Sequence, residues 1–128
     1  MAAVGPSFKL IVNGQEVARG ILHRSVSPSA VAELERARRI SGNAVVKEGS
    51  IGIPTRLKVG ASKARARFRP GELAVNPADG TLWLFLSDSQ TSMPMVPLGE
   101  VTEGVAELAK IKRGSQVSII ISPERRPP

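Results

Sequence analysis

The sequence predicts a mainly β domain of about eight short strands, and three observations support that fold class. Short apolar runs recur along the 128 residues, several of them alternating with polar residues, which is the pattern of a strand with one buried face. Turn-forming residues separate these runs, as at Asn13-Gly14 and in the NPADG stretch at 76–80. Helical spacing is confined to two stretches, 28–40 and 103–111. Short strands at this spacing are typical of a sandwich or a barrel.

An antiparallel hairpin is predicted at the start of the chain, over residues 7–13 and 15–24. Phe8 and Leu10 share one side of the first run. Asn13-Gly14 then stands between two strand-like runs, and Asn-Gly in that position is the strongest short-range hairpin signal.

The longer helix is predicted at about 28–40. Ser27 suits the N-cap position, and Pro28 suits the first helical position. The apolar residues recur at spacings of four, three and three and form one buried stripe, which consists of Ala30, Leu34, Ala37 and Ile40. Gly42 is expected to end the helix.

Residues 44–59 predict a further strand, in which Pro54 marks an edge, a bulge or a break because proline cannot donate a ladder hydrogen bond. The KARARFR stretch at 63–69 alternates strictly. Its small and aromatic residues share one face of a strand, and its cations share the other face, namely Lys63, Arg65, Arg67 and Arg69.

The last third of the chain has the clearest order of elements. Two apolar runs, LAV at 73–75 and TLWLFL at 81–86, are separated by the NPADG turn. A third strand-like segment, MVPLGEV, leads into the shorter predicted helix at 103–111, with Thr102 as N-cap and Gly114 after its end. The chain then returns in a final strand, QVSIII.

The glycines and core residues of this last third resemble the C-terminal half of cyclophilins. The matches are Gly71, the LAVNPADG turn, the WLFL strand, and Gly99-Glu-Val-Thr-Glu-Gly104 followed by VAELAKI. The closer resemblance is to small prokaryotic proteins of similar length that are described as cyclophilin-like, without an assigned function. It covers about residues 71–122 and implies a closed cyclophilin-like antiparallel β-barrel, with the helix at 28–40 covering one end. We therefore expect a single domain, 1–128, with flexible ends at about 1–6 and 123–128.

Cyclophilins are peptidyl-prolyl isomerases, so the resemblance makes that activity one hypothesis. The family's F-H-R-I segment is missing from the region NAVVKEGSIGIPTR at 43–56. By position, Leu82 stands where the family has its substrate-contacting glutamine, and Leu84 stands where it has a groove phenylalanine. Asn76 is the matching polar position. A divergent isomerase is the alternative. We expect little or no isomerase activity, because the F-H-R-I segment is missing and Leu82 replaces the glutamine, so two electrostatic contacts are lost.

No catalytic or metal-binding constellation is predicted. His23 is the only histidine, the chain has no cysteine, and no G-x-S-x-G nucleophile motif occurs. Asp79 and Asp88 are isolated in the sequence, and no second group of ligands accompanies them. The segment from Gly99 to Gly104 lacks the following Lys-Ser or Lys-Thr of a phosphate-binding loop. We therefore expect neither catalytic residues nor a metal or cofactor.

A ligand groove is predicted around the aromatic strand. Trp83 has the opposite parity to Leu82 and Leu84, so one set faces the interior while the other is covered or lines a groove. The stretch 89–97 is expected to be a loop, and its methionines suit a binding surface as well as they suit core filling. The predicted groove residues are Asn76, Leu82, Trp83, Leu84, Met93 and Met95.

The cationic face of the KARARFR stretch, formed by Lys63, Arg65, Arg67 and Arg69, is a candidate anion-binding face. Cations about 7 Å apart along a strand can follow a phosphate backbone, and arginine also pairs with carboxylates. The net charge of +7 favours acidic partners, but aromatic residues make up only 3% of the chain, so base-stacking positions are few. A solvated outer face is the alternative.

The favoured hypothesis is a protein that binds a peptide, a protein partner or a small anionic ligand on its outer face. A nucleic-acid accessory role is a further hypothesis, but nucleic acid is not the favoured partner. The apolar runs are too short to span a bilayer, and the N-terminal residues MAAVGPS lack a basic-then-apolar signal pattern. We therefore expect a cytoplasmic protein without a membrane partner.

Overall fold

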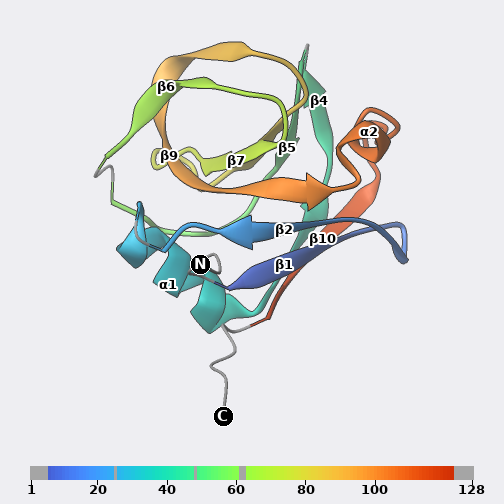
Figure 1. The fold of residues 1–128 in the computed structure, drawn as a ribbon, viewed down its shortest axis with the longest axis horizontal. Helices are drawn as coiled ribbons and strands as arrows, with labels where there is room; N and C mark the ends of the chain where they lie inside the picture. Colours follow the sequence, from blue (N-terminus) through green and yellow to red (C-terminus); the bar gives the residue numbers. More distant parts are fainter. Residues whose placement is uncertain (1–5, 25, 48, 61–62, 123–128) are drawn as a thin grey trace.

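The computed structural model describes residues 6–24, 26–47, 49–60 and 63–122, and in these ranges it contains ten strands and two helices (Figure 1). The strands are β1 (Ser7–Val12), β2 (Gln15–Leu22), β3 (Arg39–Asn43), β4 (Val45–Lys47), β5 (Ser50–Ile53), β6 (Arg65–Phe68), β7 (Glu72–Val75), β8 (Leu82–Phe85), β9 (Ser89–Glu103) and β10 (Gln116–Ser122). The helices are α1 (Pro28–Ala37) and α2 (Val105–Leu108). The expected mainly β fold is confirmed.

The strand pairs in the described ranges are antiparallel and form one path, in the order β3-β10-β1-β2-β9-β7-β8-β5-β4, with β6 paired to β9. The path is open, because its terminal strands β3 and β4 do not pair with each other, although only Ala44 separates them along the chain. The sheet is therefore antiparallel, as expected, but it is not closed into a barrel.

The opening lies between β3 and the chain that follows β5, and we call it the seam. The two segments approach at Gly42, where an added Cβ would lie 2.6 Å from the carbonyl oxygen of Pro54. No ladder joins these described segments, because Pro54 has no N–H to donate. The next residue, Thr55, is bound to the turn before β8 instead, since its hydroxyl donates to the Gly80 carbonyl. The strand expected at 44–59 is thus two short strands followed by an irregular stretch.

The predicted N-terminal hairpin is confirmed as β1 and β2. Asn13 and Gly14 have φ angles of 49° and 85°, as a two-residue turn that matches strand twist requires. The Asn13 side-chain oxygen also accepts a hydrogen bond of 3.0 Å from the Gln116 N–H. This bond ties the turn to the start of β10.

The chain ends were expected to be flexible at about 1–6 and 123–128. Within these ranges the structure describes Pro6, which is buried and whose carbonyl accepts the Leu22 N–H at 2.8 Å. The other residues of the two ranges lie outside the described residues.

Helix α1 is shorter than expected, because it ends at Ala37 rather than at residue 40. Arg38 takes a left-handed φ of 62°, and its N–H donates to the Leu34 carbonyl at the end of the helix. Ile40 belongs to β3 instead and pairs with β10. The strand ladder thus overrides the helical spacing of the apolar residues, and the helix ends well before Gly42.

Helix α2 is also shorter than the expected 103–111 and covers Val105–Leu108. Thr102 is not its N-cap, because β9 continues through Glu103, which pairs with Arg19 of β2. The residue before the helix is Gly104, which has a left-handed φ of 89°. An added Cβ there would lie 2.3 Å from the Val17 carbonyl oxygen, so the tight approach of β9 to β2 requires glycine.

Strand β9 is the longest element, and the sequence predicts it least well. Its 15 residues pair with β6, β7 and β2, and Figure 1 shows it curving round β6 and β7. The stretch 89–97, expected to be a loop, therefore belongs to a strand. Register shifts occur in all three pairings, and such irregularities bend a strand more strongly than a regular ladder does.

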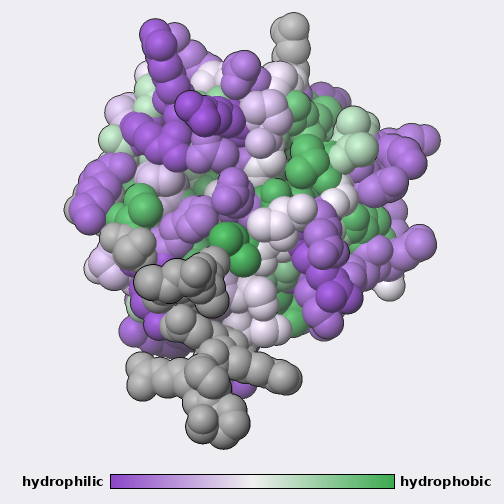
Figure 2. Space-filling view, in the orientation of Figure 1, coloured by the Kyte–Doolittle hydropathy of each residue, from purple (hydrophilic) through white to green (hydrophobic). Residues whose placement is uncertain are grey.

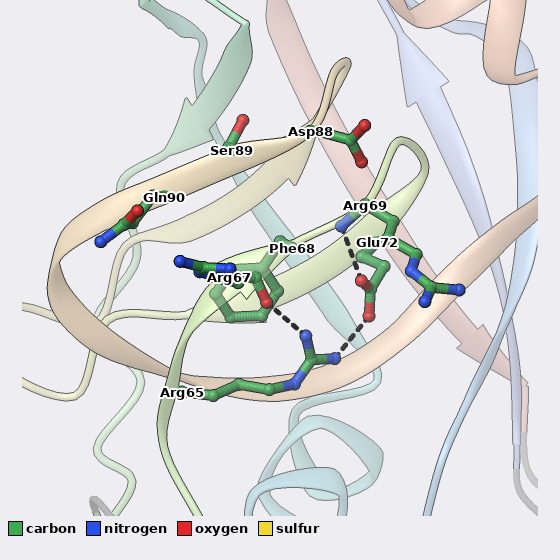
Figure 3. A pocket seen from close by; sticks show the side chains of 8 residues that line it. All are labelled: Arg65, Arg67, Phe68, Arg69, Glu72, Asp88, Ser89 and Gln90. Atoms are coloured by element: carbon green, nitrogen blue, oxygen red, sulfur yellow. Dashed lines mark hydrogen bonds and ion pairs between the residues drawn. The ribbon is translucent and has the colours of Figure 1, made fainter.

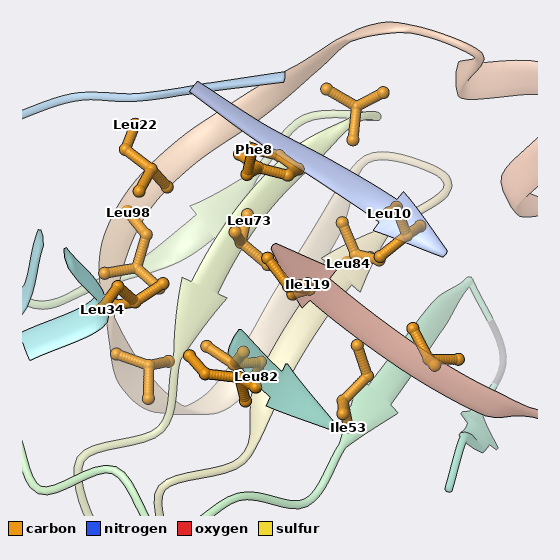
Figure 4. Packing of buried hydrophobic residues seen from close by; sticks show 14 of the residues in the cluster. Phe8, Leu10, Leu22, Leu34, Ile53, Leu73, Leu82, Leu84, Leu98 and Ile119 are labelled. Atoms are coloured by element: carbon orange, nitrogen blue, oxygen red, sulfur yellow. The ribbon is translucent and has the colours of Figure 1, made fainter. Parts of the chain in front are cut away.

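Strand β8 separates two apolar clusters because its side chains alternate between the faces of the sheet. Leu82 and Leu84 face the main core, which also holds residues of β1, β2, β10 and α1 (Figure 4). Trp83 and Phe85 face the opposite side, which we call the outer face. A smaller outer cluster forms there, and it consists of Phe68, Ala74, Trp83, Phe85 and Met95.

Candidate ligand-binding site

The outer face of β7 and β8 is covered by β6 and by the first part of β9. Phe68 from β6 stacks on Phe85 from β8, with ring centroids 4.5 Å apart and ring planes inclined by 1°. Met95 from β9 is buried in the same cluster. These contacts hold the polar stretch 89–92 beside the aromatic rings.

Trp83 lies over β5 at a position where glycine leaves room for its ring. Gly52 is the cross-strand partner of Trp83, and an added Cβ at Gly52 would lie 2.8 Å from two carbon atoms of the indole. The tryptophan is 9% exposed, and its Nε1–H has no acceptor among the described residues. A buried donor without a partner costs about 1–3 kcal/mol of stability, which an acceptor from a ligand would offset.

A pocket of about 220 Å³ opens beside the indole, and we call it the Trp83 pocket. The Nζ of Lys47, from β4, lies 5.1 Å from the centroid of a Trp83 ring, which is a cation–π distance. Lys47 forms no ion pair within the described ranges. Ser50 and the stretch 89–92 supply hydroxyl and amide groups. The pocket thus combines an aromatic surface, a positive charge and neutral polar groups.

A second pocket, of about 620 Å³, adjoins the first along Ser89 and Gln90, which line both (Figure 3). We call it the arginine pocket, and it is lined by Arg65, Arg67, Phe68, Arg69, Glu72, Asp88, Ser89 and Gln90. Arg67, Arg69 and Asp88 are exposed and form no ion pair with any described residue. Charged side chains of both signs that form no ion pair with a described residue therefore lie next to the Trp83 pocket.

Arg65 differs from the other two arginines, because other groups already hold its guanidinium. It forms an ion pair with Glu72, donates to the Arg67 carbonyl, and lies 4.5 Å from the Phe68 ring centroid (Figure 3). Burial raises the pKa of Glu72. Hydrogen bonds from Arg65 and from the Arg69 backbone N–H lower this pKa by more than burial raises it, so it lies below its ordinary value. Glu72 is therefore ionised at neutral pH and compensates the charge of Arg65.

The structure brings together only part of the predicted groove. Trp83 and Met95 line the Trp83 pocket. Leu82 and Leu84 are fully buried in the main core and do not line it. The Asn76 side chain accepts the Ala78 N–H within the turn that precedes β8. The remaining predicted residue, Met93, is 53% exposed and lines neither of the two pockets.

The four predicted cations do not form one continuous row. Lys63 precedes β6 and has a left-handed φ of 60°. The pairing of β6 with β9 shifts register between Arg65 and Arg67, and Arg65 is held by Glu72. Arg67 and Arg69 remain as exposed cations of the arginine pocket without an ion pair in the described ranges, and the charge of Arg69 helps to lower the pKa of Glu72.

Sequence reasoning missed Lys47 and Ser50, and in the candidate stretch 89–97 it singled out the methionines rather than the polar residues 89–92. The polar run SDSQTS, directly after the aromatic strand, is a signal that could have indicated the last of these. Lys47 carries no such signal, because it reaches Trp83 only through the pairing of β4 with β5 and of β5 with β8.

His23 lines neither of these pockets. The His23 Nε2 lies 3.6 Å from a carboxylate oxygen of Glu100 at the junction of β2 and β9. No group of three or more histidine, aspartate or glutamate side chains among the described residues could hold a metal ion. In the same ranges, no helix is long and apolar enough to cross a membrane.

Comparisons with known proteins identify the fold of this domain. No family model matches the chain, and no curated protein matches its sequence. The hypothetical protein AF2241 from Archaeoglobus fulgidus has a similar solution structure, with a TM-score of 0.72 and 13% identity over 96% of this chain and 98% of that chain. McbB in complex with tryptophan also has a TM-score of 0.72, with 12% identity over 94% of this chain. This chain spans 46% of the McbB chain. At these identities the likeness shows a shared fold.

Proposed function

We propose that this protein binds an anionic ligand on its outer face and that the Trp83 pocket recognises it. The observation that carries the proposal is the Trp83 indole, whose buried Nε1–H lacks an acceptor in the described ranges and whose ring lies 5.1 Å from the ammonium of Lys47. A carboxylate in this pocket would accept the indole N–H and compensate the charge of Lys47. One ligand group would thus satisfy both side chains.

The dimensions of the site favour a short acidic peptide as the ligand. The Trp83 pocket, at about 220 Å³, is smaller than the usual pocket of a drug-sized ligand and suits one chemical group. The adjoining arginine pocket has room for the rest of a chain, and its Arg67 and Arg69 favour a second acidic group. The polar stretch 89–92 offers partners to a peptide backbone.

A relationship to cyclophilins is part of this proposal, and the residues 71–122 that resemble that family support it. The seam would then be a local opening of a cyclophilin-like barrel. Leu82, at the position of the family's glutamine, is fully buried, which favours binding over isomerase activity. McbB, whose structure contains tryptophan, supports testing free amino acids as ligands too.

Fluorescence provides a direct test, because Trp83 is the only tryptophan and the chain has no tyrosine. Emission under indole excitation therefore reports on this pocket alone. We expect the peptide Ac-Ala-Glu-Ala-Glu, with a free C-terminus, to change the emission saturably. The same peptide with glutamine for glutamate and an amidated end should bind far more weakly. No saturable change at millimolar peptide would contradict the proposal.

A matched pair of charge variants tests the role of Lys47. Lys47→Gln should weaken binding of the acidic peptide by about tenfold, because a charge-assisted hydrogen bond is lost. Lys112→Gln removes the same charge from the exposed segment after α2 and should leave affinity unchanged. Equal effects of the two variants would mean that only net charge matters.

A further inference from the structure

The backbone of β3 has an unpaired edge along the seam. The Ile121 N–H donates to the Arg38 carbonyl at 2.8 Å, and the Ala44 N–H donates to the Ser115 carbonyl at 2.8 Å. In an antiparallel ladder, the backbone groups of successive residues point alternately to one neighbouring strand and to the other. These two bonds therefore show that the even-numbered residues of 38–44 direct their N–H and C=O groups toward β10. The N–H and C=O groups of Arg39 and Ser41 therefore point toward the seam. No described strand pairs with that edge.

The opposite side of the seam approaches β3 closely at Gly42, but local chemistry prevents it from forming a ladder with the edge at Arg39 and Ser41. Pro54 lacks the N–H that a ladder would need. The Thr55 hydroxyl donates to the Gly80 carbonyl and also accepts the Leu57 N–H at 3.2 Å. The chain after β5 is thus tied to the turn before β8 and cannot close the sheet itself.

A cavity of about 570 Å³ lies in the seam, and we call it the seam cavity. Arg39 and Ser41 line it from β3, whereas Pro54, Arg56 and Leu57 line it from the facing segment. Its volume falls within the usual range of ligand sites. The cavity therefore lies between an unpaired strand edge and a segment that does not pair with that edge.

The charge of this cavity is uncompensated. Arg39 and Arg56 are exposed, come from opposite sides, and form no ion pair within the described ranges. Ile40 and Leu57 add apolar surface between them. Two arginines that line one cavity without a counter-charge favour an occupant with carboxylates, since arginine binds them in a bidentate fashion.

We propose that the seam cavity binds an extended acidic segment of a partner protein, which adds a strand to the free edge of β3. The backbone of the segment would pair with Arg39 and Ser41, as in other cases of strand addition to a sheet edge. Side chains of a strand alternate, so acidic residues at every second position would face the two arginines. This site shares no lining residue with the Trp83 pocket and stands independently of the function proposed there.

Amide hydrogen exchange by NMR tests the proposal, with a hexapeptide of alternating glutamate and valine, blocked at both ends, as the probe. At saturation we expect the amides of Arg39 and Ser41 to exchange at least about tenfold more slowly, because both become bonded. A peptide of the same length with lysine for glutamate should give no protection. Equal protection by the lysine peptide, or protection by free glutamate, would overturn the proposal, as would the absence of protection.

Charge reversal supplies the matched control. R39E/R56E should weaken binding of the acidic hexapeptide by about tenfold or more, because two attractive charge pairs become repulsive. R67E/R69E makes the same change in net charge on the arginine pocket and should leave the protection of Ser41 unaltered. A similar loss in both variants would mean that the peptide responds to net charge, and the seam site would be rejected.

Discussion

The two faces of β8 contribute to apolar clusters of different size and surroundings, although their side chains alternate along four consecutive residues. On the inner face, Leu82 and Leu84 pack in a large core of apolar side chains and are fully buried. On the outer face, Trp83 and Phe85 belong to a cluster of five residues, bordered by Lys47 and the arginine pocket. Both faces are closely packed, but the outer face also holds the buried Trp83 Nε1–H without a partner in the described ranges. Such local violations are expected at functional sites.

Two buried side-chain polar atoms among the described residues lack a hydrogen-bond partner, and they can be compared with each other. They are the Ser27 Oγ and the Trp83 Nε1. The serine lies at the start of α1 and lines none of the pockets considered above, whereas Trp83 lines a pocket. We infer that only the tryptophan is left unsatisfied for a ligand.

The largest expected effect is on the inner face. Leu84→Ala should lower the free energy of unfolding by about 2–5 kcal/mol, because it leaves a cavity in a closely packed core. Trp83→Phe keeps a ring on the outer face and removes the unsatisfied donor, so it should cost less than about 1.5 kcal/mol. Urea unfolding of both variants measures the difference. A larger loss for Trp83→Phe would break the distinction between the two faces.

Gly52→Ala should disturb the outer face alone. The added methyl group would meet the indole at 2.8 Å, so we expect a loss of about 1–3 kcal/mol from overpacking. Trp83 emission should also shift, and binding of the acidic peptide should weaken. Gly60→Ala is the control, because an added Cβ there meets no atom of the described residues within 4 Å. An unshifted emission spectrum in Gly52→Ala would show that the ring does not depend on this glycine.

The ion pair of Arg65 and Glu72 should give a modest pH dependence. Because the pKa of Glu72 is lowered in the folded state, its stabilisation is present above the ordinary pKa of 4.5 and is lost as pH falls through the lower folded value. Glu72→Gln should thus cost about 0.5–1 kcal/mol at neutral pH, and the difference should disappear in acid.

Urea unfolding of both proteins at neutral pH and near the acid limit of folding measures this effect. Glu103→Gln is the control, because it removes an exposed carboxylate that makes no ion pair in the described ranges and acts on Arg19 only through the smallest of the causes that shift the Arg19 pKa. A Glu72→Gln difference that persists in acid would assign the effect to packing rather than to charge.

The smallest effect is expected at Ser27. A capping serine is normally worth about 1 kcal/mol, but Ser27 makes no side-chain capping bond and its hydroxyl is buried without a partner. Ser27→Ala should therefore change the free energy of unfolding by less than about 0.5 kcal/mol, in either direction. A loss near the usual capping value would show that the hydroxyl is bonded in solution.

Elements with local signals were predictable from the sequence. The first hairpin follows from Asn13-Gly14, and β7, β8 and β10 follow from short apolar runs between turns. Pro54, which was expected to mark an edge, a bulge or a break, directly follows the last residue of β5. These features depend on neighbours along the chain, so the printed residues suffice to find them.

Elements with distant partners were not predictable. β9 continues through 89–97 because it pairs with three strands from separate parts of the chain. Helix α1 ends early because Ile40 joins β10. The parity of β8 correctly separated Trp83 from Leu84, but it could not tell which set faced the interior, and Lys47 reached the site only through tertiary pairing.

The most direct test of the central claim is the indole resonance of the single tryptophan in a ¹H–¹⁵N spectrum. Its one Nε1–H signal reports whether that donor acquires an acceptor. We predict a downfield shift that saturates with Ac-Ala-Glu-Ala-Glu and is much weaker with the neutral, amidated peptide. A peptide that binds while the indole signal stays in place would contradict the claim that the unsatisfied donor of Trp83 recognises the ligand.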